Sequence, residues 1–195
     1  MKKITAIVLC AVLALCLFGC GEKTQEKQKE ALEQGKIYFA DIDIAGYGII
    51  TVRLDQQAAP KTVENFVNLA NDGFYTGLTF HRIIENFMMQ GGASENPPDS
   101  IVGEFRSNGH ENPLEHTRGA ISMARTSEPN SASSQFFIVH QDSPHLDGDY
   151  ACFGYVTEGM EVVDAICQTV VPSGGNGAIA EKDQPVINSI TIRTQ

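Results

Sequence analysis

The chain has 195 residues, which is enough for one domain with a hydrophobic core and a short additional segment. Its formal net charge of -10 at pH 7 argues against binding to a phosphate backbone, which requires clustered lysine and arginine. The same charge argues against electrostatic attachment to anionic lipid. Nucleic acid is therefore excluded as a partner, and contact with a membrane has to come from another feature of the chain.

Residues 1–19 have the pattern of an export signal. Lys2 and Lys3 give a positive start, residues 4–18 are almost wholly apolar, and the composition becomes polar after Cys20. The apolar run is too short, and has the wrong flanks, for a transmembrane helix. Cleavage after residue 19 removes the two lysines and so changes the formal net charge from -10 to -12.

The end of this segment, Leu17-Phe18-Gly19-Cys20, resembles a bacterial lipobox, in which a small residue precedes an invariant cysteine. The usual pattern has a small or β-branched residue where Phe18 stands. The resemblance implies cleavage before Cys20 and acylation of its sulfur and its new amine, and more than one acyl chain anchors a protein stably. A plain secretory signal that ends on an incidental cysteine is the alternative. We expect the lipoprotein form, held outside the cytoplasm on a bacterial membrane.

A polar tether and one domain follow the signal. Residues 20–35 begin with the cysteine that would be lipidated and continue as a charged, glutamine-rich segment typical of a linker. The domain is predicted to span residues 36–195. It keeps two of the five cysteines, Cys152 and Cys167, and both lie in apolar runs where free buried thiols are common. Export permits a disulfide between them, but the apolar surroundings favour two unpaired thiols.

The domain begins with a predicted hairpin and a predicted helix. Residues 37–44 and 49–54 have strand composition, and Gly46-Tyr47-Gly48 between them predicts a turn. Pro60 begins a helical segment that Asn71-Asp72-Gly73 ends. The apolar residues of this segment are spaced for one buried face: Val63, Phe66, Val67 and Ala70.

The next segment, Thr79 to Gly92 (TFHRIIENFMMQGG), has the composition of a buried strand but contains an arginine. Period-two alternation gives its first half two faces, one with Phe80, Arg82 and Ile84 and the other with His81 and Ile83. Arginine is rarely buried without a partner. An ion-paired edge residue is the ordinary explanation for Arg82, and a functional cation is the alternative.

Residues 93–118 are rich in Pro, Asn, Gly and Glu and predict a long irregular region. Beyond it, periodicity predicts three strands, a helix and a closing strand, at residues 119–124, 135–140, 150–156, 158–168 and 186–192. Many short strands, two helices and no repeat predict a closed, mainly antiparallel β-barrel whose ends are capped by α-helices.

Two predicted strands bring aromatic rings and polar donors to one surface. Alternation in residues 135–140 groups Gln135, Phe137 and Val139 on one face. Phe87, Met88 and Gln90 add an aromatic ring, a thioether and an amide. A mostly apolar surface with a few fixed polar groups is how small-ligand sites are built, although each apolar residue taken alone is more simply a core residue.

Other chemistries find less support in the sequence. Residues 140–147 (HQDSPHLD) contain two histidines and two aspartates, but they lie among predicted turns and lack a standard metal-ligand spacing. The serines at residues 131–134 lack the G-x-S-x-G elbow of a hydrolase. The chain has neither a P-loop nor a dinucleotide-binding glycine motif. We therefore expect neither a metal nor a cofactor.

Four linked motifs resemble the cyclophilin family of peptidyl-prolyl cis–trans isomerases: FHRIIENFMMQGG, GAISMAR, SSQFFIV and LDGDYACFG. Their order and spacing match the family from about Tyr38 to Ile192. The resemblance implies an eight-stranded antiparallel barrel capped by two helices. It also implies a surface groove that binds X–Pro segments of polypeptides.

The resemblance assigns roles to individual residues. Arg82 takes the place of the catalytic arginine, Gln90 helps to hold it and the substrate, and Ala124 or a neighbour supplies backbone contacts to the peptide. The other groove residues are Phe87, Met88, Phe137, His145, Leu146 and Tyr150. His145 replaces a tryptophan and Tyr150 a histidine that are common in the family, so we expect weak cyclosporin binding and intact catalysis.

The sequence thus predicts an exported, lipid-anchored, monomeric isomerase that assists the folding of secreted or surface proteins. Its arginine would stabilise the twisted X–Pro amide. The rival interpretation is a non-catalytic module that uses the same groove to hold proline-containing segments. The presence of Arg82 with Phe87, Gln90 and Phe137 favours the enzyme.

Overall fold

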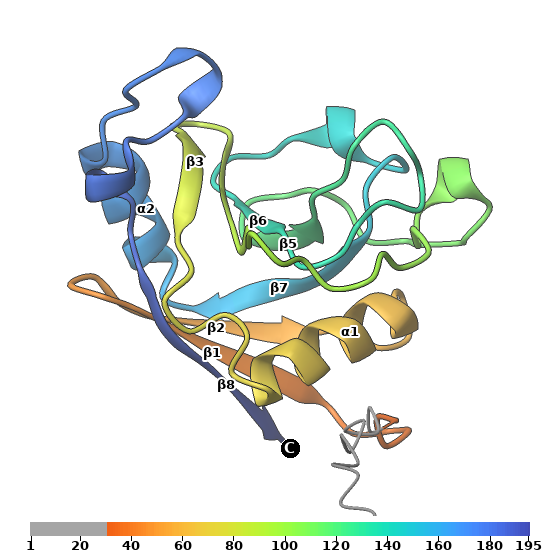
Figure 1. Cartoon of the computed structure of the whole chain (residues 1–195). Helices are drawn as coiled ribbons and strands as arrows, with labels where there is room; N and C mark the ends of the chain where they lie inside the picture. Colours follow the sequence, from red (N-terminus) through yellow and green to blue (C-terminus); the bar gives the residue numbers. More distant parts are fainter. Residues whose placement is uncertain (1–30) are drawn as a thin grey trace, which may run out of the picture.

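The computed structural model describes residues 31–195, which form one curled antiparallel sheet and two helices (Figure 1). The strands are β1 (Tyr38–Ile44), β2 (Gly48–Leu54), β3 (Phe80–Ile84), β4 (Met88–Gly91), β5 (Ala120–Met123), β6 (Phe136–Val139), β7 (Cys152–Glu158) and β8 (Ile187–Thr194). The helices are α1 (Pro60–Asn71) and α2 (Met160–Thr169). The predicted signal and Cys20 lie outside the described residues. In the part that is described, no helix is long and apolar enough to cross a membrane.

The first elements confirm the predictions made from periodicity. β1 and β2 pair antiparallel from Tyr38 opposite Leu54 to Ile44 opposite Gly48, and two glycines with positive φ shape the connection: Gly46 in the turn and Gly48 at the start of β2. α1 begins at Pro60, whose ring fixes φ near the helical value. Its predicted inward residues are all buried: Val63, Phe66, Val67 and Ala70.

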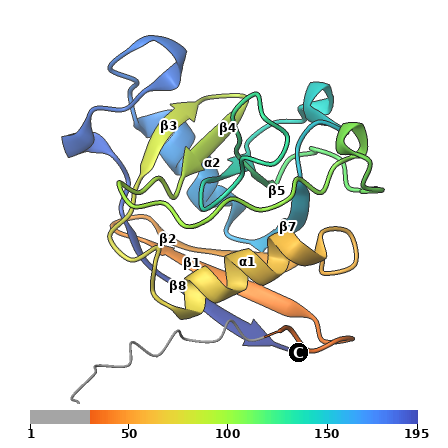
Figure 2. The ribbon, with the colours of Figure 1, turned by 45° about the vertical axis from the view of Figure 1, so that its right-hand side comes forward.

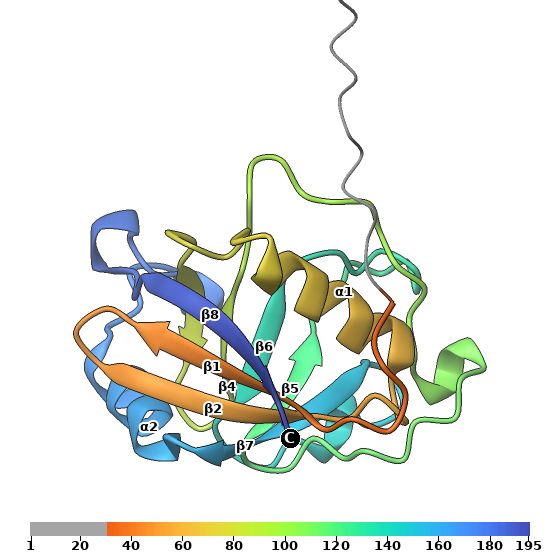
Figure 3. The same ribbon diagram turned by 90° about the horizontal axis from the view of Figure 1, so that it is seen from below.

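The helices pack on different parts of the curled sheet, α1 against β8 and α2 against β2 (Figure 3). The core beneath α1 is aromatic. The ring centroid of Phe66 lies 5.3 Å from that of Tyr75 and 5.5 Å from that of Phe136, and the second pair is edge-to-face at 89°. This packing fixes β6, and β6 carries part of the base of the site described below.

The sheet has the strand order β3-β4-β6-β5-β7-β2-β1-β8, so β3 and β8 are its edges. The expected closure of the barrel is not found, because no ladder joins these two strands within residues 31–195. The two edges meet where the strands begin, through a bridge between Thr79 and Val186, a hydrogen bond from Phe80 N–H to Pro185 O at 2.9 Å and one from Ile187 N–H to Leu78 O at 2.8 Å. Beyond this point Ile179, from the chain between α2 and β8, donates its N–H to His81 O at 2.9 Å. That chain covers the edge of β3, and the barrel therefore stays open.

The segment from Thr79 to Gly92 is a hairpin rather than one strand, as Figure 2 shows for β3 and β4. Asn86 occupies the turn with a φ of 61°. A β-bulge shifts the register between Phe80 and Arg82 and interrupts the alternation of side chains. Phe80 and Ile83 are consequently both buried in the main core. The prediction that Phe80 shares a face with Arg82 is therefore wrong.

β6 keeps strict alternation, as predicted. Phe136 and Ile138 belong to the main core, whereas Phe137 and Val139 belong to a second apolar cluster. We call this second cluster the pocket floor; its buried members are Met88, Ala120, Phe137, Val139, Leu146 and Cys152. Cys152 and Cys167 are both buried and free, in agreement with their apolar sequence context.

Candidate active site

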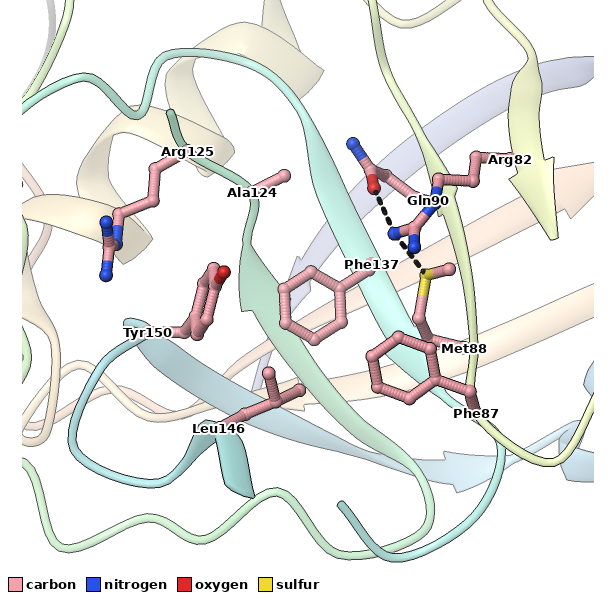
Figure 4. Close-up of a pocket in the computed structure, with 9 residues that line it drawn as sticks. All are labelled: Arg82, Phe87, Met88, Gln90, Ala124, Arg125, Phe137, Leu146 and Tyr150. Atoms are coloured by element: carbon pink, nitrogen blue, oxygen red, sulfur yellow. Dashed lines mark hydrogen bonds between the residues drawn. The ribbon is translucent and has the colours of Figure 1, made fainter. Parts of the chain in front are cut away.

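A pocket of about 130 Å³ opens above the pocket floor (Figure 4). Its lining residues are Arg82, Phe87, Met88, Gln90, Ala124, Arg125, Phe137, Leu146 and Tyr150. They come from β3, from β4 and the turn before it, from β6, and from the segments that follow β5 and precede β7. Eight of these nine residues are predicted from the sequence, and the ninth is Arg125.

Aromatic and aliphatic side chains form the base of the pocket. Phe137 is only 4% exposed, and its ring stands edge-on to that of Tyr150 at a centroid distance of 5.8 Å. Met88 and Leu146 pack with it in the pocket floor. Since these side chains are held by packing on their far side, the pocket offers a preformed surface to a compact apolar ring.

Arg82 supplies the positive charge of the site from β3. Its Nη1 donates to Gln90 Oε1 at 3.2 Å, its Nε to the backbone oxygen of Asn176 at 2.9 Å, and its Nη2 to Asn176 Oδ1 at 3.0 Å. None of these acceptors carries a charge. Burial lowers the pKa of Arg82, but an arginine starts so high that it remains protonated at physiological pH. A full positive charge is thus fixed at the pocket wall.

Gln90 extends this hydrogen bonding across the sheet. Its Oε1 accepts from Arg82, and its Nε2 donates to Gln135 Oε1 at 3.0 Å. Gln90 lies opposite Arg82 in the β3–β4 ladder and opposite Phe137 in the β4–β6 ladder. Strand register therefore places Gln90 between the cation and the apolar base of the pocket.

Arg125 forms the far wall and is a residue that the sequence did not predict. Its Nε and Nη2 donate to the backbone oxygen of Asp149 at 2.9 and 2.8 Å, and its guanidinium carbon lies 4.8 Å from the ring centroid of Tyr150. These contacts tie the segment after β5 to the segment before β7. Arg125 thereby holds Tyr150 against the pocket. Its only sequence signal is its place in GAISMAR, directly after the predicted Ala124.

His145 is the one predicted substrate-binding residue that does not line the pocket. Its ring lies 5.4 Å from the ring of Phe87, with 34° between their planes. Phe87 in turn has the guanidinium carbon of Arg82 at 5.9 Å from its centroid. His145 therefore stands behind Phe87 at the rim, and its side chain supports the pocket wall.

A buried histidine that belongs to no sequence motif supports the pocket from behind. His116 is 1% exposed and stacks on Phe137 at 6.0 Å, with 18° between the rings. Its Nδ1 lies 2.8 Å from Asp147 Oδ1 and its Nε2 lies 3.0 Å from Ser122 Oγ. Burial lowers the pKa of His116 and outweighs Asp147, which raises it. Neutral His116 then donates a hydrogen bond from Nδ1 to the carboxylate and accepts a hydrogen bond from the Ser122 hydroxyl at Nε2.

This Ser–His–Asp arrangement does not present a nucleophile to the pocket. Ser122 is fully buried at 0% exposure on β5. The stacked ring of His116 instead fixes the orientation of Phe137. Its role in the site is one of support.

The histidine and aspartate side chains of residues 140–147 interact with different partners and not with one another. His140 Nδ1 accepts from the N–H of Asn86 at 2.9 Å, and Asp142 Oδ1 accepts from the N–H of Arg118 at 2.7 Å. Asp147 Oδ1 is hydrogen-bonded to His116 Nδ1. Within residues 31–195, no group of three or more His, Cys, Asp or Glu side chains is placed to hold a metal ion.

A family model and individual relatives show similarity of this chain to the same kind of protein. A family model described as cyclophilin type peptidyl-prolyl cis-trans isomerase/CLD matches residues 39–194. Peptidyl-prolyl cis-trans isomerase A of Dickeya dadantii is 46% identical over 134 residues, which cover 66% of this chain and 70% of that protein. Peptidyl-prolyl cis-trans isomerase B of Escherichia coli is 36% identical over 155 residues, 75% of this chain and 94% of that protein.

The solved structures agree with the relatives. The crystal structure of a cyclophilin type peptidyl-prolyl cis-trans isomerase from Cryptosporidium parvum matches with a TM-score of 0.71 and 27% identity, over 82% of this chain and 99% of that chain. A crystal structure of the same protein in the presence of the dipeptide Ala-Pro matches with a TM-score of 0.69 and 28% identity, over 80% of this chain and 99% of that one.

Proposed function

Since this chain belongs to the cyclophilin family and is a peptidyl-prolyl cis–trans isomerase, we propose that Arg82 is its catalytic residue and that exported proteins are its substrates. The observation that carries the catalytic proposal is the guanidinium of Arg82. It is held by uncharged acceptors at the wall of a small apolar pocket.

The barrier to be lowered is that of amide rotation. Loss of amide resonance makes rotation about a peptide bond cost roughly 18–20 kcal/mol. X–Pro bonds populate both isomers, and their uncatalysed exchange takes about tens of seconds or longer. In the twisted transition state the proline nitrogen becomes pyramidal and regains a localised lone pair. A hydrogen-bond donor aimed at that nitrogen stabilises the twisted state and neither planar isomer, which is the selectivity that catalysis requires.

Arg82 has donors left for this task. An arginine has five N–H groups, and Asn176 and Gln90 accept from three of them. The others are on Nη1 and Nη2, and Nη1 also lies 3.8 Å from Met88 Sδ, a weak acceptor. In the proposed reaction the proline ring rests on Phe137 and the free N–H groups face its nitrogen. The carbonyl of the preceding residue rotates, and no bond is made or broken.

Export is supported by the sequence of residues 1–20, which lie outside the described structure. The positive start, the apolar run and Leu17-Phe18-Gly19-Cys20 together support a lipoprotein that assists the folding of secreted or surface proteins. Labelling of producing cells with palmitate tests this step. The wild-type chain should take up the label and the Cys20→Ser variant should not.

The first experiment measures isomerisation of a short Ala-Pro-Phe peptide by residues 36–195, using exchange NMR. Arg82→Ala should lower kcat/KM by about 10²–10³-fold, the usual effect of losing one preorganised transition-state donor. Peptide affinity should change far less, because the apolar base of the pocket remains. Arg53→Ala, at an exposed position on β2, is the matched control and should keep full activity.

The outcomes separate the enzyme from a binding module. A folded wild-type domain that binds the peptide without accelerating exchange would be a non-catalytic holder of proline segments. Acceleration that survives Arg82→Ala would contradict the role given to this arginine and leave the pocket as the site.

A further inference from the structure

The guanidinium of Arg82 is held from two sides, and a single residue outside the pocket provides one of them. Asn176 accepts from Nε through its backbone oxygen and from Nη2 through Oδ1. Gln90 accepts from Nη1 on the other side. Asn176 is not among the residues that line the pocket. We propose that Asn176 is a positioning residue that sets the direction of the Arg82 guanidinium; the inference rests on the proposed catalytic role of Arg82.

Two acceptors on one edge of a guanidinium constrain it more than one acceptor does. Nε and Nη2 lie on the same edge of the planar group, so oxygens at 2.9 and 3.0 Å define both its plane and its tilt. The bond to Gln90, at 3.2 Å, is longer and contacts only Nη1. Without Asn176 the guanidinium would retain that one bond and could pivot about it. A donor that pivots is not preorganised for the twisted amide.

The backbone conformation of Asn176 explains how one residue presents both oxygens. Its φ of 62° and ψ of 22° lie in the left-handed region, which asparagine adopts more readily than most residues. The next residue, Gly177, also has a positive φ of 80°. A Cβ at Gly177 would lie 2.4 Å from Ile84 Cγ1 and 2.7 Å from Ile83 O. Glycine at this position therefore lets the loop close directly against β3.

The loop that carries Asn176 is bonded to the strand that carries Arg82. Ala178 forms an isolated bridge with Arg82, and Ile179 N–H donates to His81 O at 2.9 Å. Ser173 N–H donates to Ala178 O at 2.9 Å and closes the loop on itself. The position of Asn176 relative to Arg82 is thus fixed by the backbone on both sides of the contact.

Asn176 also holds Arg82 without reducing its charge. An aspartate or glutamate at this place would hold the guanidinium equally well, but its negative charge would offset the positive charge that faces the substrate. An amide oxygen and a backbone oxygen orient the group and leave that charge in place. Asn176 can therefore position the guanidinium of Arg82 without neutralising it.

The test compares Asn176→Gly with Asn86→Gly in the full domain. Glycine keeps the left-handed conformation and the backbone acceptor at position 176; of the two oxygens that accept from Arg82, its missing side chain removes only Oδ1. We expect kcat to fall by about tenfold with KM nearly unchanged, the effect of losing one hydrogen bond to a charged group. Asn86 is the matched control, because it has a φ of 61° in the β3–β4 turn and its N–H bond to His140 survives the change. Asn86→Gly should keep the wild-type kcat.

A spectroscopic measurement shows whether the effect passes through Arg82. In protein with ¹⁵N-labelled arginine, the Nη2 protons of Arg82 should exchange with water faster in Asn176→Gly than in the wild type. Asn176→Asp keeps both acceptors and should leave these protons protected, so it provides a second variant if the glycine variant folds poorly. Faster exchange in Asn176→Asp would overturn the inference.

The kinetic results distinguish failure of this inference from failure of the proposed mechanism. Wild-type kcat in Asn176→Gly, or an equal loss in Asn86→Gly, would overturn the positioning role. If Arg82→Ala abolishes activity while Asn176→Gly retains it, only this inference fails. If Arg82→Ala retains activity, the proposed mechanism fails instead.

Discussion

Single residues at the pocket show how an acidic chain keeps positive charge where it is needed. Arg82 donates to amide and backbone oxygens, and Arg125 donates to the backbone oxygens of Asp149 and Thr126. Backbone and amide oxygens satisfy guanidinium donors without adding negative charge. No acidic residue lines the pocket, so its two arginine walls remain cationic although the formal net charge of the chain is -10.

From His116, which is buried, and His81, which is half-buried, we predict that the domain loses stability in mild acid. Burial lowers the pKa of His116, and burial together with Arg82 lowers the pKa of His81. In the unfolded chain both have a pKa of about 6.5, so the unfolded state binds protons first as the pH falls. The free energy of unfolding should be insensitive to these groups above about pH 7.5 and should decrease as the pH passes below about 6.5. Urea denaturation at several pH values measures this change.

His116→Gln is the informative variant for this prediction. Glutamine does not titrate, so the variant should show a smaller decrease in stability between neutral pH and mild acid, whatever its stability at pH 7.5. A wild-type domain whose stability rises with acidification over that range would contradict the direction of both shifts.

At the scale of elements, local sequence patterns were sufficient to predict those helices and strands whose form is determined by their own residues. The β1–β2 hairpin and α1 follow from the turn glycines, from Pro60 and from a periodic apolar face, and all were predicted. The alternation of β6 was predicted for the same reason. The bulge at Phe80 and Arg82 depends on how β3 pairs with β4, and pairing between strands is not encoded in the period of one strand.

The site shows the same division between local and long-range information. The lining residues predicted from sequence lie in continuous motifs, so resemblance to a family located them. His116 meets Asp147 across 31 positions of sequence, and Arg82 meets Asn176 across 94. No spacing rule relates residues so far apart, and only the folded sheet brings them together. The open edge of the barrel has the same origin, since residues 178–179 take the place beside β3 that closure requires.

In the connection between α2 and β8, alanine substitution at two nearby glycines should change the stability of the domain by different amounts. Gly177→Ala places a Cβ 2.4 Å from Ile84 Cγ1 and 2.7 Å from Ile83 O, at a φ of 80°. We expect it to lower the free energy of unfolding by about 1–3 kcal/mol, since both the contact and the backbone conformation are strained. Gly175→Ala meets no atom within 4 Å and should be close to neutral. Chemical denaturation of both variants measures the difference, and equal stabilities would refute the close approach of this loop to β3.

At the scale of the whole molecule, the chain enters the domain far from the pocket. Residues 31–36 lie beside α1 and β8, in a hollow shared with Val67 and Arg193. In Figures 1 and 2 this end of the molecule lies below β3 and β5. Of the residues that line the pocket, Arg82 lies on β3, and Ala124 and Arg125 directly follow β5. A protein held through its N-terminus would therefore present the pocket away from the surface that holds it.

Attachment to vesicles tests this orientation without relying on lipidation. Residues 1–20 are replaced by a histidine tag and bound to nickel-chelating lipid, which leaves the tether in place. The kcat/KM for a short peptide should stay within about twofold of the value in solution, because the pocket remains accessible to diffusion.

The opposite orientation provides the control. Burial raises the pKa of Cys152 and of Cys167 to about 12, so neither thiol competes for a maleimide lipid in the folded protein. In a chain without residues 1–20, which contain the other three cysteines, a cysteine introduced by Glu128→Cys in the exposed loop that follows Arg125 becomes the single attachment point. Attachment there turns the pocket toward the bilayer and should lower kcat/KM toward a folding protein substrate more than toward a short peptide, because a larger substrate is excluded more strongly. Equal rates in both orientations would mean that the tether does not determine how the pocket faces the membrane.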